Sequence, residues 1–310
     1  MDTKSTYYSA GKFLLSGEYL VLDGAKSVGL PCTLGQSMEL SQGPGRGRLT
    51  WLSYTKDAQL WMSCILDLKD LEVIETSDVS FSTRLQQVIR ACLDLGGYPL
   101  DLALDYTFTT SLEFDPAWGL GSSSTFIANI ADFFNVNPYK LLERTFGGSG
   151  YDIAAAQAKR PFYYQLNAGG TEVSSVDFRP SFRSSLFFVY LNEKQNSRTG
   201  IKSYKSVTKN KDSYIERVSA ISESLMLSDT LSQFSALIDE HEQLISELMD
   251  MQPVKDRLFS DFAGSIKSLG AWGGDFVLAC SAQGPKYLEA YFKEKGYNVI
   301  LGYDQIIKYE

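Results

Sequence analysis

The stretch Asp115-Pro-Ala-Trp-Gly119-Leu-Gly121-Ser-Ser-Ser124 runs directly into the apolar pattern Thr125-Phe-Ile-Ala-Asn-Ile-Ala-Asp-Phe-Phe134. The two glycines allow a tight turn and leave room for a ligand beside the main chain. Serines at a helix start accept hydrogen bonds from its unpaired N–H groups. The same N–H groups, with the positive end of the helix dipole, form a site for phosphate. The stretch therefore predicts either a phosphate-binding loop or the plain cap of a buried helix.

Two common phosphate-binding motifs do not describe this loop. No Gly-Lys-Ser or Gly-Lys-Thr closes it, so it is not a Walker A loop, and it lacks the third glycine of the dinucleotide fingerprint. Its function must be inferred from the stretches around it.

Composition limits the class of protein. With 310 residues, 44% of them hydrophobic, the chain can form one large or two ordinary domains. A net charge of −8 argues against nucleic acid or an acidic membrane as partner, and an anionic substrate would need a local cluster of cations. Four cysteines without CxxC spacing, no signal-peptide core and no apolar run of membrane-spanning length favour a cytoplasmic protein. The single histidine, His241, excludes a multi-histidine metal site.

The first half of the chain contains segments with the alternating pattern of strands and segments with the spacing of helices. Phe13–Leu15 and Tyr19–Leu22 are short β-prone runs, with Asp23-Gly24 as a turn signal. Residues 38–74 alternate as in a meander, with a turn at 43–47. A helix over 84–95, a strand over 102–112 and a helix from Pro138 follow. The glycine-rich turn Gly147–Gly150 then leads into a small-residue helix that carries Asp152.

The second half predicts an α+β domain of the split βαβ type. A strand at Leu186–Leu191 is followed by the polar loop Asn192–Gly200. Tyr204–Leu248 and Leu258–Leu269 have helical patterns, and Gly270–Asp275 leads into a strand, a helix and a last strand. The composition changes between Arg179 and Ser184, which predicts domains at 1–181 and 182–310.

Four stretches, in this order, resemble the GHMP kinase superfamily (galactose, homoserine, mevalonate and phosphomevalonate kinases). They are Gly11-Lys12-Phe-Leu-Leu-Ser-Gly17-Glu18-Tyr19, Gly119-Leu-Gly-Ser-Ser-Ser124, Gly148-Ser-Gly-Tyr-Asp152 and Gly270-Ala-Trp-Gly-Gly-Asp275. The resemblance implies a two-domain α+β fold: a ribosomal protein S5 domain 2-like N-terminal domain, a ferredoxin-like C-terminal domain and an active site in the cleft.

The resemblance also implies ATP and Mg²⁺ as cofactors. The ATP phosphates would be held by Gly119, Leu120, Gly121, Ser122, Ser123 and Ser124. Ser122 or Ser123 would ligate Mg²⁺ together with Glu143. The alternative for Glu143 is an exposed helical glutamate.

Catalysis and substrate binding fall on the other motifs. Asp152 would accept or steer the proton of the acceptor, with Lys12 neutralising charge. The expected substrate ligands are Glu18, Tyr19, Lys194, Ser197, Arg198, Gly273, Gly274 and Asp275. The alternatives are solvated charges for Lys12, Glu18 and the Lys194 loop, and a dipole-stabilising role for Asp152.

The substrate is predicted from the departures within the motifs. Gly17-Glu18-Tyr19, where mevalonate and galactose kinases usually carry Gly-Glu-His, and Gly273-Gly274-Asp275 favour phosphomevalonate. Trp272 and Tyr151 depart from the family pattern. Mevalonate kinase is the next candidate, before homoserine or sugar kinases; diphosphomevalonate decarboxylase fits the Gly119 loop less well. A nucleotide-binding sensor and a purely structural protein remain as alternatives, and both a monomer and a homodimer are compatible with the sequence.

Overall fold

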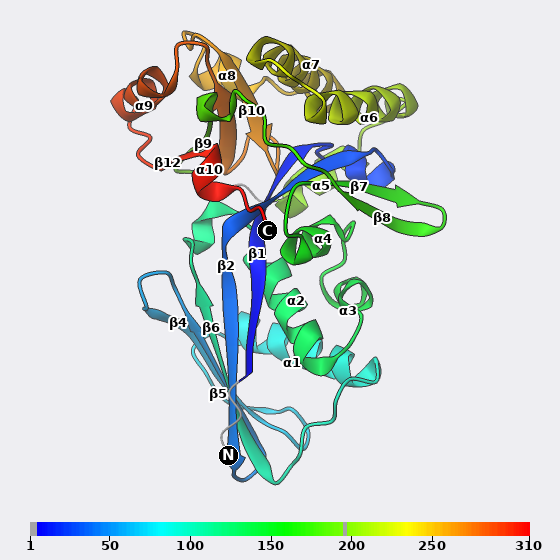
Figure 1. Cartoon of the computed structure of the whole chain (residues 1–310). Coiled ribbons are helices and arrows are strands. Elements are labelled where there is room, and N and C mark those ends of the chain that lie inside the picture. The colour runs from blue at the N-terminus through cyan, green and yellow to red at the C-terminus, as the bar shows by residue number, and fades with distance from the viewer. Residues whose placement is uncertain (1–4, 195–196) are drawn as a thin grey trace. The chain divides into compact units, whose positions relative to one another are not determined.

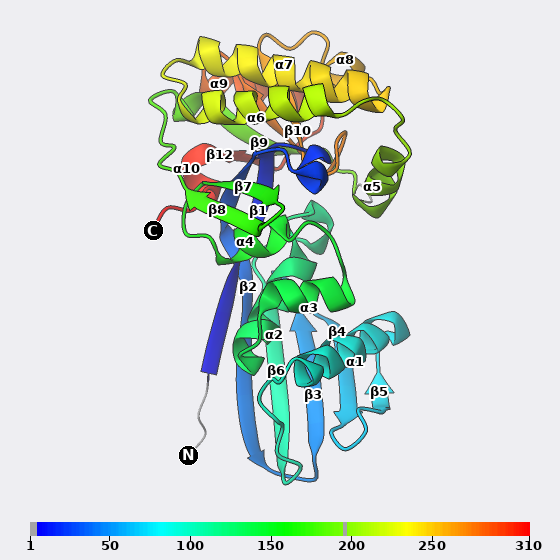
Figure 2. The same cartoon turned by 90° about the vertical axis from the view of Figure 1, so that its right-hand side faces the viewer.

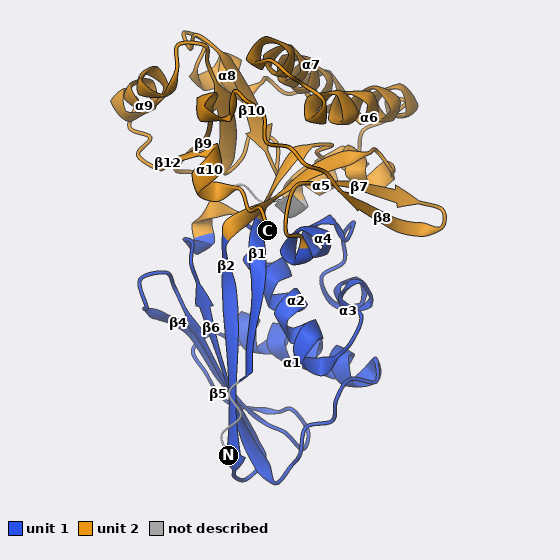
Figure 3. Cartoon of the chain, viewed as in Figure 1, with its two compact units in different colours: residues 1–11, 34–116, 120–157 blue, residues 12–33, 117–119, 158–310 orange. Residues whose placement is uncertain are grey.

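The computed structural model describes residues 5–194 and 197–310, and the chain forms two compact units (Figures 1 and 3). Unit 1 comprises residues 1–11, 34–116 and 120–157; unit 2 comprises residues 12–33, 117–119 and 158–310. The units are interleaved along the chain because β1 (Ser5–Ser16) and β2 (Ser27–Pro44) each run from one unit into the other. The division at 181/182 stays a prediction.

Unit 1 contains a mixed sheet. Its strands are β3 (Arg48–Tyr54), β4 (Leu60–Asp67), β5 (Val73–Thr76), β6 (Leu104–Leu112) and part of β2, in the order β5-β4-β3-β6-β2. All neighbours are antiparallel except β3 and β6, which are parallel. The meander prediction is wrong at its first turn, because β6 pairs with both β2 and β3 and so separates them.

The helices of unit 1 begin at recognisable caps. They are α1 (Val79–Asp94), α2 (Ser122–Phe134), α3 (Pro138–Thr145) and α4 (Tyr151–Gln157). Asp78 accepts a hydrogen bond from the Phe81 N–H at the start of α1, and Asn137 caps α3, where proline is the first helical residue. Helices α1, α2 and α3 contact one another, and Figure 2 shows them in front of the sheet.

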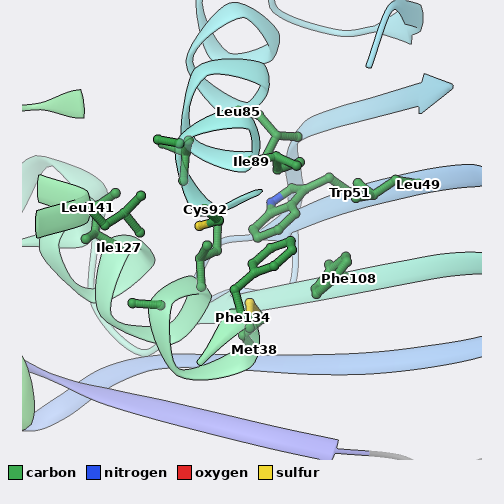
Figure 4. Close-up of a cluster of buried hydrophobic side chains, with 14 of the residues drawn as sticks. Met38, Leu49, Trp51, Leu85, Ile89, Cys92, Phe108, Ile127, Phe134 and Leu141 are labelled. Carbon is green, nitrogen blue, oxygen red and sulfur yellow. The ribbon is translucent and has the colours of Figure 1, made fainter. Parts of the chain in front are cut away.

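The core of unit 1 lies between these helices and the sheet (Figure 4). Trp51 of β3 stacks on Phe108 of β6, with ring centroids 5.2 Å apart. Leu85, Ile89 and Cys92 of α1 are buried against the same cluster. The alternating burial along β3 is the pattern that its sequence predicts.

Unit 2 contains a second sheet of four antiparallel strands. They are β9 (Leu186–Tyr190), β10 (Ser265–Leu269), β11 (Phe276–Cys280) and β12 (Ile300–Gly302), in the order β10-β11-β9-β12. Helices lie between β9 and β10 and between β11 and β12, giving the β-α-β-β-α-β order. The prediction of an α+β half is confirmed. The hairpin of β7 (Phe162–Asn167) and β8 (Gly170–Ser175) belongs to the first sheet, because β7 pairs with the start of β2; β1 pairs with β2 as well.

Unit 2 also contains helices. They are α5 (Ser197–Lys205), α6 (Asp212–Met226), α7 (Leu231–Met249), α8 (Val254–Leu258), α9 (Pro285–Glu294) and α10 (Tyr303–Ile306), with short 3₁₀ turns η1 (Leu20–Asp23), η2 (Pro116–Trp118) and η3 (Arg183–Ser185). Helices α6 and α7 pack side by side, and α7 contacts β10 (Figure 2). Over the described residues, no helix combines the length and apolar character needed to span a bilayer.

Two element predictions are wrong for identifiable reasons. Tyr19–Leu22 is not a strand, because positive φ angles at Gly17 (93°) and Tyr19 (61°) turn the chain into η1. The helix expected over Leu258–Leu269 is not formed. Helix α8 ends at Leu258, and the residues that follow include β10. Pairing of all five β10 residues with β11 overrides the local pattern there.

Candidate active site

The turn before α2 needs glycine at two positions. Gly119 and Gly121 have φ angles of 68° and 94°. A Cβ atom on Gly119 would lie 1.9 Å from Oδ2 of Asp275, which belongs to the same unit. A side chain at Gly119 would therefore strain the backbone and would displace the Asp275 carboxylate.

The N-terminus of α2 is open. Its N-cap, Gly121, has no side chain to accept the first N–H groups, and among the described residues no hydrogen bond is made by the N–H of Ser122 or Ser123. Ser123 is exposed and Ser122 is half-buried. The hydroxyl of Ser124 instead donates to the Gly121 carbonyl at 2.7 Å and is buried. Two adjacent N–H groups and two hydroxyls thus remain available to a ligand.

Asp152 lies in the first turn of α4, and α4 packs on α2 in unit 1. The preceding turn uses positive φ at Gly147, Gly148 and Gly150. The side chain of Asp152 is exposed, while Tyr151 and Ile153 beside it are buried. Burial of its neighbours fixes the face of α4 on which the carboxylate lies.

Glu143 is exposed on α3, which contacts α2. Within the described part of the chain, no three His, Cys, Asp or Glu side chains group as a metal site. Ser123 and Glu143 would therefore need phosphate oxygens or water to complete the shell of a Mg²⁺ ion, the usual arrangement for magnesium on a nucleotide.

Lys12 is a half-buried residue of β1 in unit 2. It lies near Cys32, whose thiol pKa is raised by burial and lowered in part by the Lys12 charge. Lys12 is thus a cation at the start of the segment that leads to Glu18.

Glu18 and Tyr19 are buried in unit 2. The carboxylate of Glu18 is 0% exposed, and its Oε1 accepts a hydrogen bond from Nζ of Lys267 at 2.5 Å. The hydroxyl of Tyr19 accepts from the N–H of Trp272 at 3.2 Å, and its ring stacks on Tyr204. That these two residues bind substrate stays a prediction; in the structure they contact protein groups.

Sequence reasoning missed the partners of Glu18. Lys267, Glu242 and His241 are also buried, and Lys267 lies in the middle of β10. The Glu242 carboxylate accepts hydrogen bonds from Lys267 (3.1 Å), Ser268 (3.0 Å) and the indole of Trp272 (2.9 Å). The one sequence signal is a lysine between Ile266 and Leu269, in a segment that the sequence predicts as helix.

Burial shifts the pKa values of Glu18 and His241 in opposite directions. Loss of solvation raises the pKa of Glu18 to about 7, although the Lys267 charge opposes the rise. Loss of solvation, with the charge of Lys267, holds the pKa of His241 well below its usual value. Nε2 of His241 accepts from the Gly17 N–H at 3.1 Å and lies 3.2 Å from Oε2 of Glu18. A proton on Oε2 of Glu18 would make this oxygen a donor to Nε2 of His241, whose lone pair it would share with the Gly17 N–H.

The last predicted segments are only partly described. Lys194 is exposed in unit 2. Ser197 and Arg198 begin α5, and their side chains lie outside the described residues. The loop Gly270–Asp275 joins β10 to β11, with a φ of 86° at Gly273. A Cβ on Gly274 would lie 2.0 Å from the Ala271 carbonyl oxygen, so the loop requires glycine there.

The site residues thus form two sets. Unit 1 holds the open end of α2, together with Glu143 and Asp152 on the helices α3 and α4 that contact α2. Unit 2 holds Lys12, Glu18, Tyr19, Gly119, Lys194 and the loop Gly270–Asp275. Of these residues, Gly119 and Asp275 lie against each other.

Comparison of the sequence gives no relative: no family model matches the chain, and no curated protein does. Comparison of the structure gives full-length matches. The mevalonate kinase of Methanococcus jannaschii has a TM-score of 0.72 at 15% identity, covering 99% of both chains. Streptococcus pneumoniae phosphomevalonate kinase, in complex with phosphomevalonate and AMPPNP, has a TM-score of 0.69 at 17% identity, covering 94% of this chain and 97% of that chain.

Lactococcus lactis galactokinase, complexed with galactose, has a TM-score of 0.68 at 14% identity, covering 99% of this chain and 94% of that chain. The resemblance to GHMP kinases is therefore confirmed at the level of structure. At these identities it concerns fold and leaves the acceptor open. The chain has the α+β fold of the GHMP kinases over its whole length.

Proposed function

We propose that the protein is an ATP-dependent small-molecule kinase that transfers the γ-phosphoryl group to phosphomevalonate. The observation that carries the proposal is the open N-terminus of α2, where two N–H groups and the hydroxyls of Ser122 and Ser123 have no protein partner within the described residues. A phosphate group is the ligand that such a helix end favours.

Phosphoryl transfer suits this set of residues because it depends on positioning and charge stabilisation more than on covalent chemistry. Backbone N–H groups of Gly119–Ser124 would hold the phosphates. A fold neighbour was solved with AMPPNP, which supports ATP as the nucleotide. Ser123 and Glu143 offer two exposed oxygen ligands in one unit, and oxygen donors suit Mg²⁺. When bound, Mg²⁺ would neutralise part of the phosphate charge.

Asp152 is the proposed proton acceptor or orienting group, and Lys12 the cation that offsets charge on the phosphates. If the acceptor is already a phosphate, little deprotonation is needed, and Asp152 acts mainly by orientation. Lys194, Ser197 and Arg198 would attract an anionic substrate against the net charge of −8. Gly273, Gly274 and Asp275 would contact it, whereas Glu18 and Tyr19 would act from the buried network.

Phosphomevalonate is preferred because Tyr19 follows Glu18 in the first motif, and mevalonate is the second candidate acceptor. Homoserine, sugars and a non-catalytic nucleotide sensor rank below them. A cytoplasmic monomer or homodimer remains the expectation for the assembled protein.

The test is ADP release from Mg-ATP by purified protein, with mevalonate, phosphomevalonate, homoserine and galactose offered in parallel. Turnover confined to phosphomevalonate is expected. Turnover with mevalonate alone would replace the substrate assignment and keep the kinase. Stabilisation by Mg-ATP without turnover of any acceptor would favour a sensor. If Mg-ATP gives neither turnover nor stabilisation, the phosphate-site interpretation of α2 is contradicted.

A further inference from the structure

The loop Gly270–Asp275 has a buried tryptophan, Trp272, at its centre. Trp272 is 3% exposed although both neighbouring positions, Ala271 and Gly273, are partly exposed. Its ring packs in a cluster of unit 2 with Tyr19, Tyr204 and Ile245. The loop is therefore attached to the interior at its centre.

Two directional bonds set the orientation of Trp272. Its backbone N–H donates to the Tyr19 hydroxyl at 3.2 Å, and its indole Nε1–H donates to Oε1 of Glu242 at 2.9 Å. Packing restricts the rotamer of a buried indole, and a hydrogen bond from its N–H to a buried carboxylate adds a directional constraint on the ring.

The acceptor is itself fixed. Oε1 of Glu242 also accepts from Nζ of Lys267 at 3.1 Å, and Oε2 accepts from the Ser268 hydroxyl at 3.0 Å. Nζ of Lys267 makes two further bonds, to Glu18 at 2.5 Å and to the Ser268 carbonyl at 2.8 Å. The three ammonium protons of Lys267 can thus all be paired.

Buried ion pairs seldom add stability over apolar residues of the same size, since desolvation offsets the attraction. A directional hydrogen bond to a neighbouring group is a contact that apolar residues cannot supply. Here the oriented group is Trp272, three residues before Asp275. The Asp275 carboxylate lies against Gly119, at the start of the predicted phosphate loop.

We propose that Glu242 is a positioning residue: through its bond to the Trp272 indole it sets the loop Gly270–Asp275, and through Asp275 the start of the Gly119 loop. The kinetic consequence rests on the proposed kinase function; the order of the loop does not.

Two variants separate orientation from stability. Trp272→Phe keeps an aromatic ring but removes the indole donor. Glu242→Gln can place its amide oxygen where Oε1 receives Trp272 and Lys267, and its amide nitrogen toward the Ser268 hydroxyl, which can reverse to accept. Trp61→Phe, at an exposed tryptophan of β4, is the matched control.

Amide hydrogen exchange across residues 270–275 is the primary measurement. In Trp272→Phe we expect amide exchange in this loop to be at least about 10-fold faster, because the loop loses a hydrogen bond to a charged group. Exchange in α7 should not change. In Glu242→Gln the loop should keep its protection while the thermal midpoint falls, because Lys267 loses a charged partner. Trp61→Phe should leave both unchanged.

Unchanged loop exchange in Trp272→Phe would overturn the proposal. So would acceleration that extends equally through α7 and β10, because Trp272 would then support the unit as a whole. If the wild type turns over an acceptor, Trp272→Phe should raise the KM for Mg-ATP several-fold while Glu242→Gln does not. If it turns over none, the kinase assignment fails and hydrogen exchange still decides the positioning role.

Discussion

At the scale of the residue, Asp152 is the most exposed of the proposed catalytic groups, and its side chain is not part of the hydrophobic core. Asp152→Asn should therefore fold and bind Mg-ATP normally but lose about 10²–10⁴-fold in turnover, the usual contribution of a positioned acid or base. Asp212→Asn is the matched control, since Asp212 is likewise exposed in the first turn of a helix. Steady-state kinetics and nucleotide titration measure both; near-normal turnover would remove Asp152 from the mechanism.

The neighbouring serines of α2 are expected to behave differently. Ser123 is exposed, whereas the Ser124 hydroxyl is bonded to Gly121. Ser123→Ala should weaken Mg-ATP binding or turnover with little change in stability. Ser124→Ala should lower the free energy of unfolding by about 1 kcal/mol and largely keep nucleotide affinity. Calorimetry and ATP titration of both proteins measure this, and the reverse pattern would mean that Ser124 is the ligand.

At the scale of the element, α2 begins at a glycine in the left-handed region. Gly121→Ala should cost about 1–2 kcal/mol, because an L-residue is strained at a φ of 94°. Gly284→Ala is the matched control: Gly284 is the N-cap of α9, its φ is 83°, and a Cβ there would meet nothing within 4 Å. Denaturation should show a loss in Gly284→Ala at least as large as in Gly121→Ala, because a ψ of 179° places Gly284 in a region that is essentially restricted to glycine. Only Gly121→Ala should also weaken ATP binding. Equal ATP affinity in the two variants would mean that the turn at Gly121 does not contribute to nucleotide binding.

Elements were predictable where the signal is local. The glycines before α2, the cap of α3 by Asn137 and the alternation of β3 are each specified by a few adjacent residues. Long-range pairing was not predictable in the same way: β6 lies between β2 and β3, and β10 pairs with β11 although its own sequence has a helical pattern. Glu18 and Lys267 are 249 positions apart, so no local pattern could join them. The glycine turns could therefore be predicted from sequence, and the buried network could not; that these turns bind a ligand stays a prediction.

At the scale of the whole molecule, the pair Glu18 and His241 has a consequence for stability against pH. A Glu18 pKa raised to about 7 gives stability that is present below its unfolded value, 4.5, and is lost as pH rises toward 7. A lowered His241 pKa acts the other way: its contribution is present above 6.5 and is lost as pH falls. Between pH 4.5 and pH 6.5 the folded pair holds one proton, on Glu18, and the unfolded chain also holds one, on His241. The two effects therefore cancel in the wild type.

Glu18→Gln should reveal the histidine. Glutamine replaces the protonated carboxyl and can still donate to Nε2 of His241, so the variant should fold. Its stability should then fall with decreasing pH below about 6.5, relative to the wild type, by up to about 1.4 kcal/mol per pH unit, since only the unfolded chain still gains a proton. Urea denaturation from pH 5 to 7.5 measures the slope, with Glu223→Gln, at an exposed partner of Lys26, as control. A slope equal to that of the wild type would mean that the folded protein does not keep this proton on Glu18.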